Sequence, residues 1–442
     1  MKHVLILALL TAILASGTCF AQAKRLELVP PPVAPASAPA VAAHPSPYNF
    51  SNVQYPRIEA DSRVTFRFNA PDAKRVQVSI VNVPFDMVKG SDGAWTYTSA
   101  PQAPGYHNYW MIVDGAVVLD PGTNAFIGYS HMCNGFEIPE PGVDWYDLKE
   151  VPHGNVLIKN YFAKTTNSWR RIFVYTPPGY EANARTRYPV FYLQHGGGED
   201  ERVWIEMGRT NVILDNLLAA GKVKPMIVVM ETSAVGAPGA GRGAGQGAGA
   251  PAGAAAGAGR GAGQGAGTAA GRGPGMPGTG GPGGGAYGQF MVKELIPWID
   301  KNFRTLANRE NRAMAGLSMG AGQTISVTMA NLDKFSHVGL FSGGAATPRR
   351  VAGQTAPPAP APLDFKTIYN GQMANPAEFN KKVKVFFFST GSLENPDGLK
   401  SHQEQLVAAG ITNSYVYVSP GTAHEWQTWR RSLYTFAPLL FR

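Results

Sequence analysis

The sequence predicts a doubly wound α/β domain preceded by a small all-β sandwich. From Arg63 onward, apolar and polar residues alternate in short runs separated by Gly-containing turns, as in antiparallel sandwiches. From about Val151 the expected strands are continuous apolar runs with helical patterns between them, which is typical of a mostly parallel sheet covered on both faces. The length of 442 residues and the 44% hydrophobic content suffice for two such domains.

The sandwich is expected to occupy residues 51–140. Asp92-Gly93, Pro104-Gly105 and Asp114-Gly115 are turn signals, and Pro139-Glu140-Pro141-Gly142 marks the boundary to the next domain. Its clearest predicted strands are Val64–Phe68, Val76–Ile80 and Tyr106–Val113.

The α/β domain is expected over residues 141–442. A tract at 234–286 is nearly all Gly, Ala and Pro, so it cannot bury enough apolar surface to offset its ordering entropy and is predicted to be a disordered insert. A shorter Pro/Ala loop is expected at 353–363. The predicted strands are Arg171–Val174, Val190–Gln194, Met226–Met230, Arg312–Ala315, Val338–Phe341, Val383–Phe388 and Tyr415–Ser419. The predicted helices are Val203–Ala219, Phe290–Asn302, Gly320–Asn331, Leu399–Ala409 and Trp426–Leu440.

The first 50 residues carry targeting and linker signals. Residues 1–23 combine a basic start, an apolar run too short to span a bilayer, and Ala21-Gln22-Ala23, so we expect a signal peptide cut after Ala23. The protein is therefore predicted to be periplasmic or extracellular, without a membrane span, and residues 24–50 to form a flexible Pro/Ala-rich leader. Cleavage would leave Cys133 as the remaining cysteine, so a large core rather than a disulfide must stabilise the chain.

Several other binding functions are not expected. The net charge of +9 does not indicate a nucleic-acid partner, because Lys and Arg do not alternate with aromatic residues and several Arg lie in the Gly-rich tract. G-x-G-x-x-G matches at 278–283 and 283–288 lie in the same tract without a preceding strand, so we reject a dinucleotide site. His424-Glu425 begins like the zinc motif H-E-x-x-H, but residue 428 is Thr. Neither a cofactor nor a metal is expected.

The strongest chemical signal is Gly316-Leu317-Ser318-Met319-Gly320. It lies between a predicted buried strand and an apolar helix, which is the context of the G-x-S-x-G nucleophile elbow in α/β-hydrolases. Glycines two residues either side of Ser318 allow the strand and helix to pack closely while the hydroxyl projects. The amide of Met319 then lies at a helix N-terminus and can donate to an oxyanion.

A second signal, His195-Gly196-Gly197-Gly198, directly follows the predicted strand Val190–Gln194. A substrate carbonyl can reach backbone amides here because no side chain intervenes. We expect Gly197 to supply the other oxyanion donor, with Gly198 as the alternative. A flexible strand–helix turn is the competing interpretation.

The general base and the acid should follow the serine in sequence. Of the three histidines downstream, His337 lies just before a predicted strand and His402 lies in a predicted helix, whereas His424 follows a strand and turn at the start of the last helix. The acid should end the strand Val383–Phe388, since its carboxylate must reach the imidazole. Glu394 is preferred, and Asp397 is the alternative. The candidate substrate contacts are Trp204 and Trp426, which serve equally well as packing residues.

These motifs together resemble the esterase D group of α/β-hydrolases, which includes feruloyl, acetyl-xylan and enterochelin esterases. The resemblance covers about Val151 to Arg442 and implies Ser318 and His424 as members of a catalytic triad, with Met319 and Gly197 as the oxyanion pair. Arg63-Val64-Thr65-Phe66 and Ala70-Pro71-Asp72-Ala73 resemble an immunoglobulin-like, glycogen-binding-type module, for which no ligand is assumed. The segments that carry the resemblance are Val151–Gly154, Tyr175–Tyr180, His195–Gly198, Gly316–Gly320, Gly421–Trp426 and Trp429-Arg430.

The function expected from the sequence is a secreted serine carboxylesterase that removes feruloyl or acetyl groups from plant polysaccharide or oligosaccharide through an acyl-enzyme. The partner is therefore an acylated carbohydrate or another small ester, and the oligomeric state is left open. Two alternatives remain within catalysis, a siderophore esterase and a mycolyltransferase-like acyltransferase. A carbohydrate-binding protein with a decayed site is the alternative without catalysis.

Overall fold

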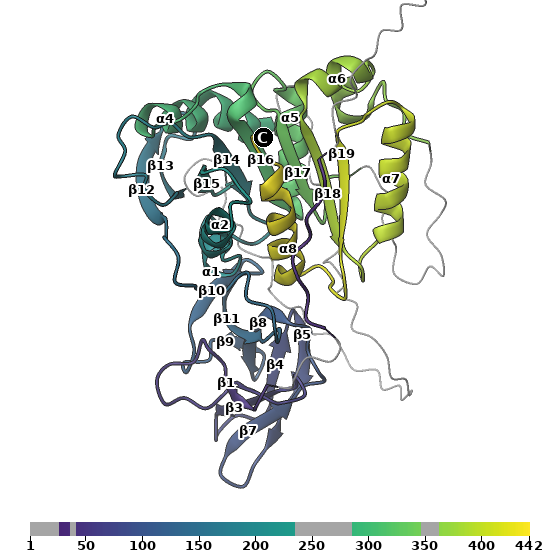
Figure 1. Cartoon of the computed structure of the whole chain (residues 1–442). Coiled ribbons are helices and arrows are strands. Elements are labelled where there is room, and N and C mark those ends of the chain that lie inside the picture. The colour runs from purple at the N-terminus through teal and green to yellow at the C-terminus, as the bar shows by residue number, and fades with distance from the viewer. Residues whose placement is uncertain (1–25, 36–40, 235–284, 346–361) are drawn as a thin grey trace, which may run out of the picture.

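The computed structural model describes residues 26–35, 41–234, 285–345 and 362–442. Figure 1 shows a β-sandwich packed beneath a larger α/β domain, with the C-terminus on the α/β domain. The predicted signal peptide lies outside the described residues, as do residues 235–284 of the predicted insert and 353–361 of the shorter loop. The fold class expected from the sequence, a sandwich followed by an α/β-hydrolase domain, is confirmed.

The sandwich consists of two antiparallel sheets with the orders β1-β2-β3-β7-β6 and β10-β11-β8-β4-β5, and β9 pairs with β8. Its core lies between the sheets, because alternate residues of each strand point inward: Val64 and Phe66 of β3 are fully buried whereas Arg67 is exposed. The strands are β1 (His44–Pro45), β2 (Arg57–Ile58), β3 (Val64–Asn69), β4 (Val76–Ile80), β5 (Val83–Asp86), β6 (Val88–Lys89), β7 (Ala94–Thr98), β8 (Gly105–Val113), β9 (Ala116–Val118), β10 (Ala125–Gly128) and β11 (His131–Ile138).

The α/β domain is built on an eight-stranded sheet with the order β12-β13-β15-β14-β16-β17-β18-β19. The six strands β15-β14-β16-β17-β18-β19 run parallel to one another, while β12 and β13 are antiparallel additions at one edge. Because β14 pairs in parallel with β16, the carboxyl ends of these two strands lie side by side. The glycine loop after β14 and the Ser318 turn after β16 follow these ends. The strands are β12 (Asn155–Ala163), β13 (Ser168–Thr176), β14 (Val190–Gln194), β15 (Ile227–Glu231), β16 (Arg312–Leu317), β17 (His337–Phe341), β18 (Val385–Gly391) and β19 (Ser414–Ser419).

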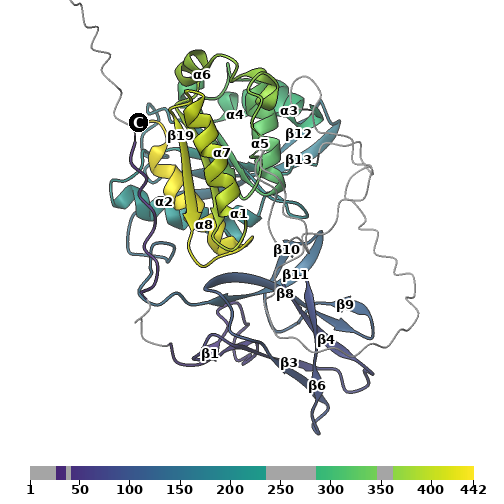
Figure 2. The same ribbon diagram turned by 90° about the vertical axis from the view of Figure 1, so that its right-hand side faces the viewer.

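Helices cover both faces of this sheet (Figure 2). The helices α1, α2 and α8 enclose one core with the sheet, and α3 to α7 enclose two further clusters on the opposite face. The predicted helix Val203–Ala219 is divided in two, because Arg209 adopts a left-handed conformation with φ 51°. The helices are α1 (Val203–Glu206), α2 (Thr210–Ala219), α3 (Gly285–Phe290), a π-helical turn (Met291–Leu295), α4 (Ile296–Asn302), α5 (Met319–Ala330), α6 (Pro376–Lys382), α7 (Pro396–Ala408) and α8 (Trp426–Phe436), with short 3₁₀ turns at Arg309–Asn311, Ile368–Gly371 and Ala437–Leu439.

Buried ion pairs join the sandwich to the last helix. Glu137, on β11, binds the guanidinium of Arg430 with both carboxylate oxygens, at 2.5 and 3.2 Å, and Arg430 has no exposed side-chain surface. Glu140, just beyond β11, accepts from Arg431 Nη2 at 2.6 Å. These contacts bring β8, β10 and β11 against α1 and α8, as Figure 1 shows.

The described part of the leader is ordered along the α/β domain, which differs from the expected flexible linker. Leu26 and Leu28 pack against the core that includes α2 and α8. The carbonyl of Pro32 accepts from the indole of Trp145 at 3.1 Å. The strand β1 begins at His44, so the sandwich starts before residue 51. A composition rich in Pro and Ala therefore did not exclude packing, because the few apolar side chains in the leader reach a neighbouring core.

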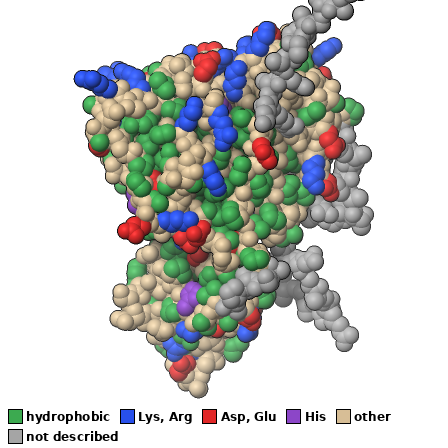
Figure 3. All heavy atoms as spheres, viewed as in Figure 1, with side chains coloured by type: hydrophobic (Ala, Val, Ile, Leu, Met, Phe, Trp, Pro, Cys, Tyr) green, Lys and Arg blue, Asp and Glu red, His purple; other side chains and the backbone are tan. Residues whose placement is uncertain are grey.

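Charged side chains are dispersed over the surface in view in Figure 3, where Lys and Arg lie among Asp and Glu. Cys133 is a buried free thiol on β11. In the described ranges, every helix is too short or too polar to cross a bilayer. The same residues contain no group of three or more His, Cys, Asp and Glu side chains suited to holding a metal ion.

Candidate active site

Ser318 lies in a strained turn between β16 and α5. Its backbone has φ 52° and ψ −114°, a region that residues with a side chain rarely adopt, and its amide donates to the carbonyl of Phe341 at 2.8 Å. Both flanking glycines are required by close packing. A Cβ on Gly316 would lie 2.6 Å from the Gly320 carbonyl, and a Cβ on Gly320 would lie 2.3 Å from the His195 carbonyl oxygen. The close packing of β16, α5 and the loop after β14 thus keeps Ser318 in its strained conformation.

The structure brings three of the predicted residues into one hydrogen-bonded chain. Nε2 of His424 lies 2.9 Å from Oγ of Ser318, and Nδ1 lies 2.7 Å from Oε1 of Glu394. A carboxylate bonded to Nδ1 fixes the tautomer in which Nε2 is free to accept the serine proton. The His424 ring also packs perpendicular to that of Trp429, with ring centroids 5.1 Å apart.

Glu394 is fixed by donors on its second oxygen. Oε2 accepts from the Gly391 amide at 2.7 Å, from Ser342 Oγ at 2.8 Å and from Thr390 Oγ1 at 3.0 Å. Burial alone would raise the pKa of this carboxyl, but the hydrogen bond and charge of His424 and these donors together lower it. Glu394 is therefore held as a carboxylate facing the imidazole.

Asp397, the alternative acid, lies elsewhere. Its side chain is 92% exposed in the first turn of α7, and its nearest cation is Lys400 at 3.7 Å. Asp397 is thus a solvent-exposed helix residue, whereas Glu394 faces His424.

The loop after β14 lies against the serine turn. A Cβ on Gly197 would be 3.9 Å from the Met319 Cβ, so the two predicted oxyanion donors belong to adjacent backbone segments. Nε2 of the buried His195 accepts from the Ser233 amide, so Nδ1 carries the proton and donates to the Gly196 carbonyl at 2.7 Å. That carbonyl shares a peptide unit with the Gly197 amide, and His195 therefore orients this amide.

A cavity of about 120 Å³ opens over these groups. Trp426 lines it, as predicted for a substrate contact. Trp204 does not: it is 1% exposed in the core and its indole donates to the Gln194 carbonyl at 2.9 Å. The lining also includes residues of the sandwich, whose place in the site no local sequence pattern indicated. The lining residues are Val81, Tyr106, His107, Asn108 and Tyr129 of the sandwich, and Gly196, Gly197, Glu199, Leu317, Ser318, His424, Glu425, Trp426 and Trp429 of the α/β domain.

Comparisons with known proteins identify esterases among the proteins that this chain resembles. Residues 266–439 match the model of the Esterase family, described as "Putative esterase". A Xylanibacter ruminicola protein named endo-1,4-beta-xylanase/feruloyl esterase is 34% identical over 406 residues, which cover 90% of this chain and 47% of that protein. The endo-1,4-beta-xylanase Y of Acetivibrio thermocellus is 23% identical over 329 residues, covering 68% of this chain and 24% of the relative. The chain thus spans about half or less of the length of the curated relatives it matches.

The enterobactin esterase of Shigella flexneri has a similar structure, with a TM-score of 0.54 at 14% identity over 85% of this chain and 92% of that one. The ferric enterobactin esterase of Salmonella typhimurium gives a TM-score of 0.52 at 14% identity, over 87% and 95% of the two chains. The chain has the α/β-hydrolase fold of these esterases. The similarity extends over both the sandwich and the α/β-hydrolase domain, since it covers more of the chain than either domain alone.

Several residues around the α/β-hydrolase site were not predicted from the sequence. Ser342, just after β17, bonds Glu394 and also accepts from the Trp429 indole at 3.1 Å. The sequence signal that could have found it is the pair of glycines that follows, Gly343 and Gly344, and Ser342 adopts a positive φ of 52° in this turn. By contrast, His107 and Tyr129 come from the sandwich, and no local pattern indicates that they reach the cavity.

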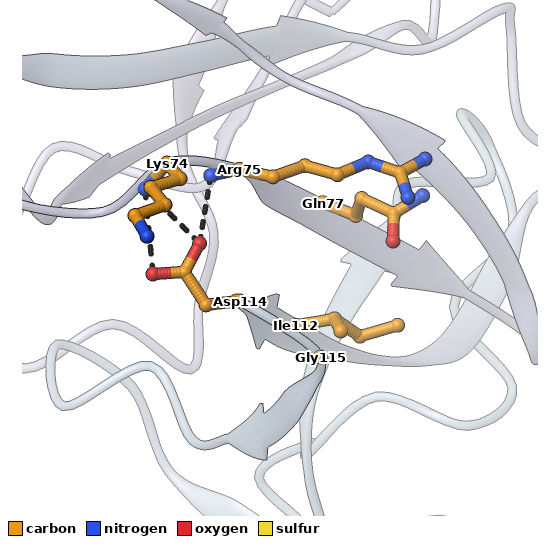
Figure 4. Close-up of a pocket in the computed structure, with 6 residues that line it drawn as sticks. All are labelled: Lys74, Arg75, Gln77, Ile112, Asp114 and Gly115. Carbon is orange, nitrogen blue, oxygen red and sulfur yellow. Dashed lines mark hydrogen bonds between the residues drawn. The ribbon is translucent and has the colours of Figure 1, made fainter. Parts of the chain in front are cut away.

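A second hollow lies on the outer side of the sandwich, between Lys74, Arg75, Gln77, Ile112, Asp114 and Gly115 (Figure 4). Asp114 there accepts from the amides of Lys74 and Arg75, at 3.0 and 2.8 Å, and so closes a turn of the sandwich. The Arg75 guanidinium is paired with the exposed Asp86. These polar groups already have partners within the fold, so we assign no function to this hollow.

Proposed function

We propose that the protein is a serine carboxylesterase that works through an acyl-enzyme, with Ser318 as nucleophile, His424 as general base and Glu394 as the acid that orients it. The observation that carries this proposal is the continuous chain of hydrogen bonds from Glu394 through His424 to a serine in a strained turn at a cavity. A buried structural serine would require neither the strain nor the access.

In the first step Ser318 Oγ attacks the ester carbonyl carbon while His424 Nε2 takes the hydroxyl proton. The C–O bond to the alcohol breaks, and the same proton passes from Nε2 to the departing alkoxide. In the second step water attacks the acyl-serine, His424 accepts its proton, and the carboxylic acid leaves as Ser318 regains its hydrogen. Glu394 stabilises the imidazolium that forms twice in this cycle.

The amides of Met319 and Gly197 are proposed to bind the negative oxygen that develops at the carbonyl. Met319 is the first residue of α5, so its N–H is unpaired within the helix and lies at the positive end of the helix dipole. The Gly197 amide is oriented through His195. Gly197 is exposed and carries no side chain, so a substrate oxygen can reach this amide. Preorganised donors of this kind typically contribute about 10²–10³ in rate each.

The proposed substrates are feruloyl or acetyl esters of plant polysaccharide or oligosaccharide. Support for this class comes from the Xylanibacter ruminicola relative, whose name joins a xylanase with a feruloyl esterase. The cavity also fits an aromatic acyl group, since Tyr106, Tyr129, Trp426 and Trp429 line it. A panel of methyl ferulate, nitrophenyl acetate and a catecholate siderophore ester would rank the acyl groups, and addition of an alcohol acceptor would separate hydrolysis from acyl transfer.

The decisive experiment compares the wild-type protein with Ser318→Ala and with Ser91→Ala, an exposed serine of the sandwich. We expect Ser318→Ala to lower kcat for nitrophenyl acetate by about 10⁴–10⁶-fold and to abolish labelling by a fluorophosphonate, while Ser91→Ala changes neither. Retention of turnover and labelling by a folded Ser318→Ala protein would refute the proposed nucleophile.

A further inference from the structure

Glu199 is an acidic residue in the wall of the cavity that the proposed reaction does not use. Its Oε2 accepts from the Gly196 amide at 2.7 Å, one peptide away from the Gly197 amide. The side chain is partly exposed because it faces the cavity, and among the described residues Oε1 has no hydrogen-bond partner. The cavity wall therefore contains a carboxyl group next to the place where negative charge would develop.

We propose that Glu199, in its uncharged form, is a positioning residue that holds the oxyanion loop Gly196–Gly198, and that its ionisation suppresses ester hydrolysis in alkaline solution. This inference rests on the proposed function, because it assigns Glu199 a role in the same reaction.

The loop is fixed at three peptide units, two of them by the residues that flank it and one by the sandwich. Glu199 holds the amide of Gly196, and His195 Nδ1 holds the Gly196 carbonyl. The third bond comes from the sandwich, where the Ser130 amide donates to the Gly198 carbonyl at 2.9 Å. Loss of the Glu199 bond would free the first of these units and allow the adjacent Gly197 amide to rotate.

The space around the loop leaves little room for another arrangement. A Cβ on Gly196 would lie 2.5 Å from the Leu317 side chain and 2.9 Å from Glu199 Oε2. Gly198 has φ +76°, and a Cβ there would lie 2.6 Å from the Ser130 amide nitrogen. Glu199 is thus packed into the loop that it bonds, and a shortened side chain would leave both a gap and an unpaired amide.

Burial raises the pKa of Glu199 to about 8, and the charge of Asp200 adds to this effect while the Gly196 amide opposes it. Asp200 itself is paired with Arg202. From the sandwich, Tyr129 and Cys133 face Glu199, and burial raises the pKa of both, with Glu199 contributing. The other ionisable residues that line the cavity are Tyr106, His107, His424 and Glu425, and no Lys or Arg occurs among the described lining residues.

The absence of a cation in that lining determines how the carboxyl affects the reaction. A neutral Glu199 accepts from Gly196 without adding charge near the oxyanion. An ionised Glu199 keeps this bond but places a negative charge near a second, developing negative charge in a site of low polarity, which raises the barrier. We therefore expect kcat to fall as the pH rises through about 8.

The test uses full-length Glu199→Gln and Glu199→Ala proteins, with Glu404→Gln on the exposed side of α7 as the matched control. Gln has the same shape, can still accept from Gly196 and does not titrate. We expect it to keep kcat near pH 7 within about 3-fold and to lose the fall in kcat around pH 8. Glu199→Ala should lower kcat by about 10–100-fold with little change in KM, because a misplaced oxyanion donor affects the transition state more than substrate binding. Glu404→Gln should reproduce the wild-type profile.

A stability measurement gives a second readout that does not depend on activity. A carboxyl group whose pKa is higher in the folded state binds its proton more tightly there, so its contribution to stability is complete below about pH 4.5 and is lost as the pH rises through about 8. The thermal midpoint of the wild-type protein should therefore fall relative to that of Glu199→Gln as the pH is raised across this window.

Two results would overturn the inference: an alkaline fall in kcat that is identical in Glu199→Gln and the wild type, or a folded Glu199→Ala protein with unchanged kcat. Failure of the proposed function looks different. In that case the wild-type protein would not hydrolyse any ester of the panel, and the fluorophosphonate would not label Ser318.

Discussion

At the residue scale, the choice between Glu394 and Asp397 is decided by hydrogen bonding. The Glu394 carboxylate accepts hydrogen bonds from four donors, including His424, whereas Asp397 is exposed on α7. We expect Glu394→Gln to lower kcat by up to about 10⁴-fold, because an amide cannot stabilise the imidazolium and can hold the wrong tautomer. Asp397→Asn is the matched control and should leave kcat unchanged. The measurement is steady-state hydrolysis of nitrophenyl acetate; the opposite ranking of the two variants would transfer the acid to Asp397.

The lowered pKa of Glu394 also predicts how acid affects stability. Its folded-state pKa lies below the usual 4.5, so the carboxylate contributes stability above about pH 4.5 and this contribution is lost as the pH falls through the folded value. Between about pH 5 and pH 3, the unfolding midpoint of the wild-type protein should therefore decrease more steeply than that of Glu394→Gln. Parallel curves from urea denaturation would show that Glu394 carries no such linkage.

The sequence indicated residues whose chemistry depends on local motifs and missed those that depend on contacts. Ser318 and His424 each follow a recognisable strand and turn, so their positions could be predicted. Glu199 stands in the same glycine-rich segment as Gly197, but its value as an acceptor for Gly196 depends on a backbone geometry that spacing does not reveal. Trp204 shows the converse error, since an aromatic near a motif is as readily part of the core.

At the scale of elements, the serine turn works only because α5 crosses the oxyanion loop closely. We predict that Gly320→Ala destabilises the protein and lowers kcat, since its Cβ would lie 2.3 Å from the His195 carbonyl oxygen and 2.8 Å from that of Gln194. Both are backbone atoms and cannot move aside independently, so the strain should cost about 1–3 kcal/mol. The measurements are urea denaturation and kcat for nitrophenyl acetate.

Gly322 provides a control within the same helix. A Cβ there meets nothing within 4 Å, and Ala is the better helix former by about 1 kcal/mol. Gly322→Ala should therefore maintain or raise stability with unchanged kcat. Equal effects of the two substitutions would indicate that close packing at Gly320 is not what holds the serine turn.

Elements with strong periodicity were predicted well, and those set by edge pairing or by docking were not. The strand Val190–Gln194 was found with its exact bounds, as a buried apolar run should be. The edge strand β12 was missed because its exposed face includes Ile158 and Phe162, which breaks the alternation. The break at Arg209 was missed although Gly208 directly precedes it, because an isolated Gly is tolerated within a helical pattern. The Arg209 side chain is held there by the Tyr146 carbonyl and Glu137.

At the scale of the whole molecule, the sandwich and the α/β domain form one unit around the cavity. The sandwich supplies part of the cavity lining and the Ser130 bond to the oxyanion loop. Helix α8 begins directly after His424-Glu425 and carries the two arginines that hold the sandwich. The sequence predicted both folds but not the ion pairs that join them, because Arg430 and Arg431 look locally like ordinary charged helix residues. Their burial is set by Glu137 and Glu140, nearly three hundred residues away in sequence.

The ion pair between Glu137 and Arg430 should therefore control the stability of both domains. Burial would raise the pKa of Glu137, but Arg430, Arg209 and the Tyr48 hydroxyl lower it overall, so the pair is ionised. Glu137→Gln leaves the guanidinium of Arg430 buried without its counter-charge, which typically costs about 3–5 kcal/mol. We expect a lower unfolding midpoint in urea together with a lower kcat, since loosening the sandwich also releases Ser130 from the oxyanion loop.

Two further variants make this prediction specific. Asp92→Asn removes an exposed pair with Arg67 at the far end of the sandwich and should leave both the midpoint and kcat nearly unchanged. The double variant Glu137→Met with Arg430→Met removes both charges and should recover much of the stability, because apolar side chains of similar volume can replace a buried pair. If Glu137→Gln altered stability no more than Asp92→Asn, the pair would not couple the domains, and the sandwich would have to be held against α8 by its apolar contacts alone.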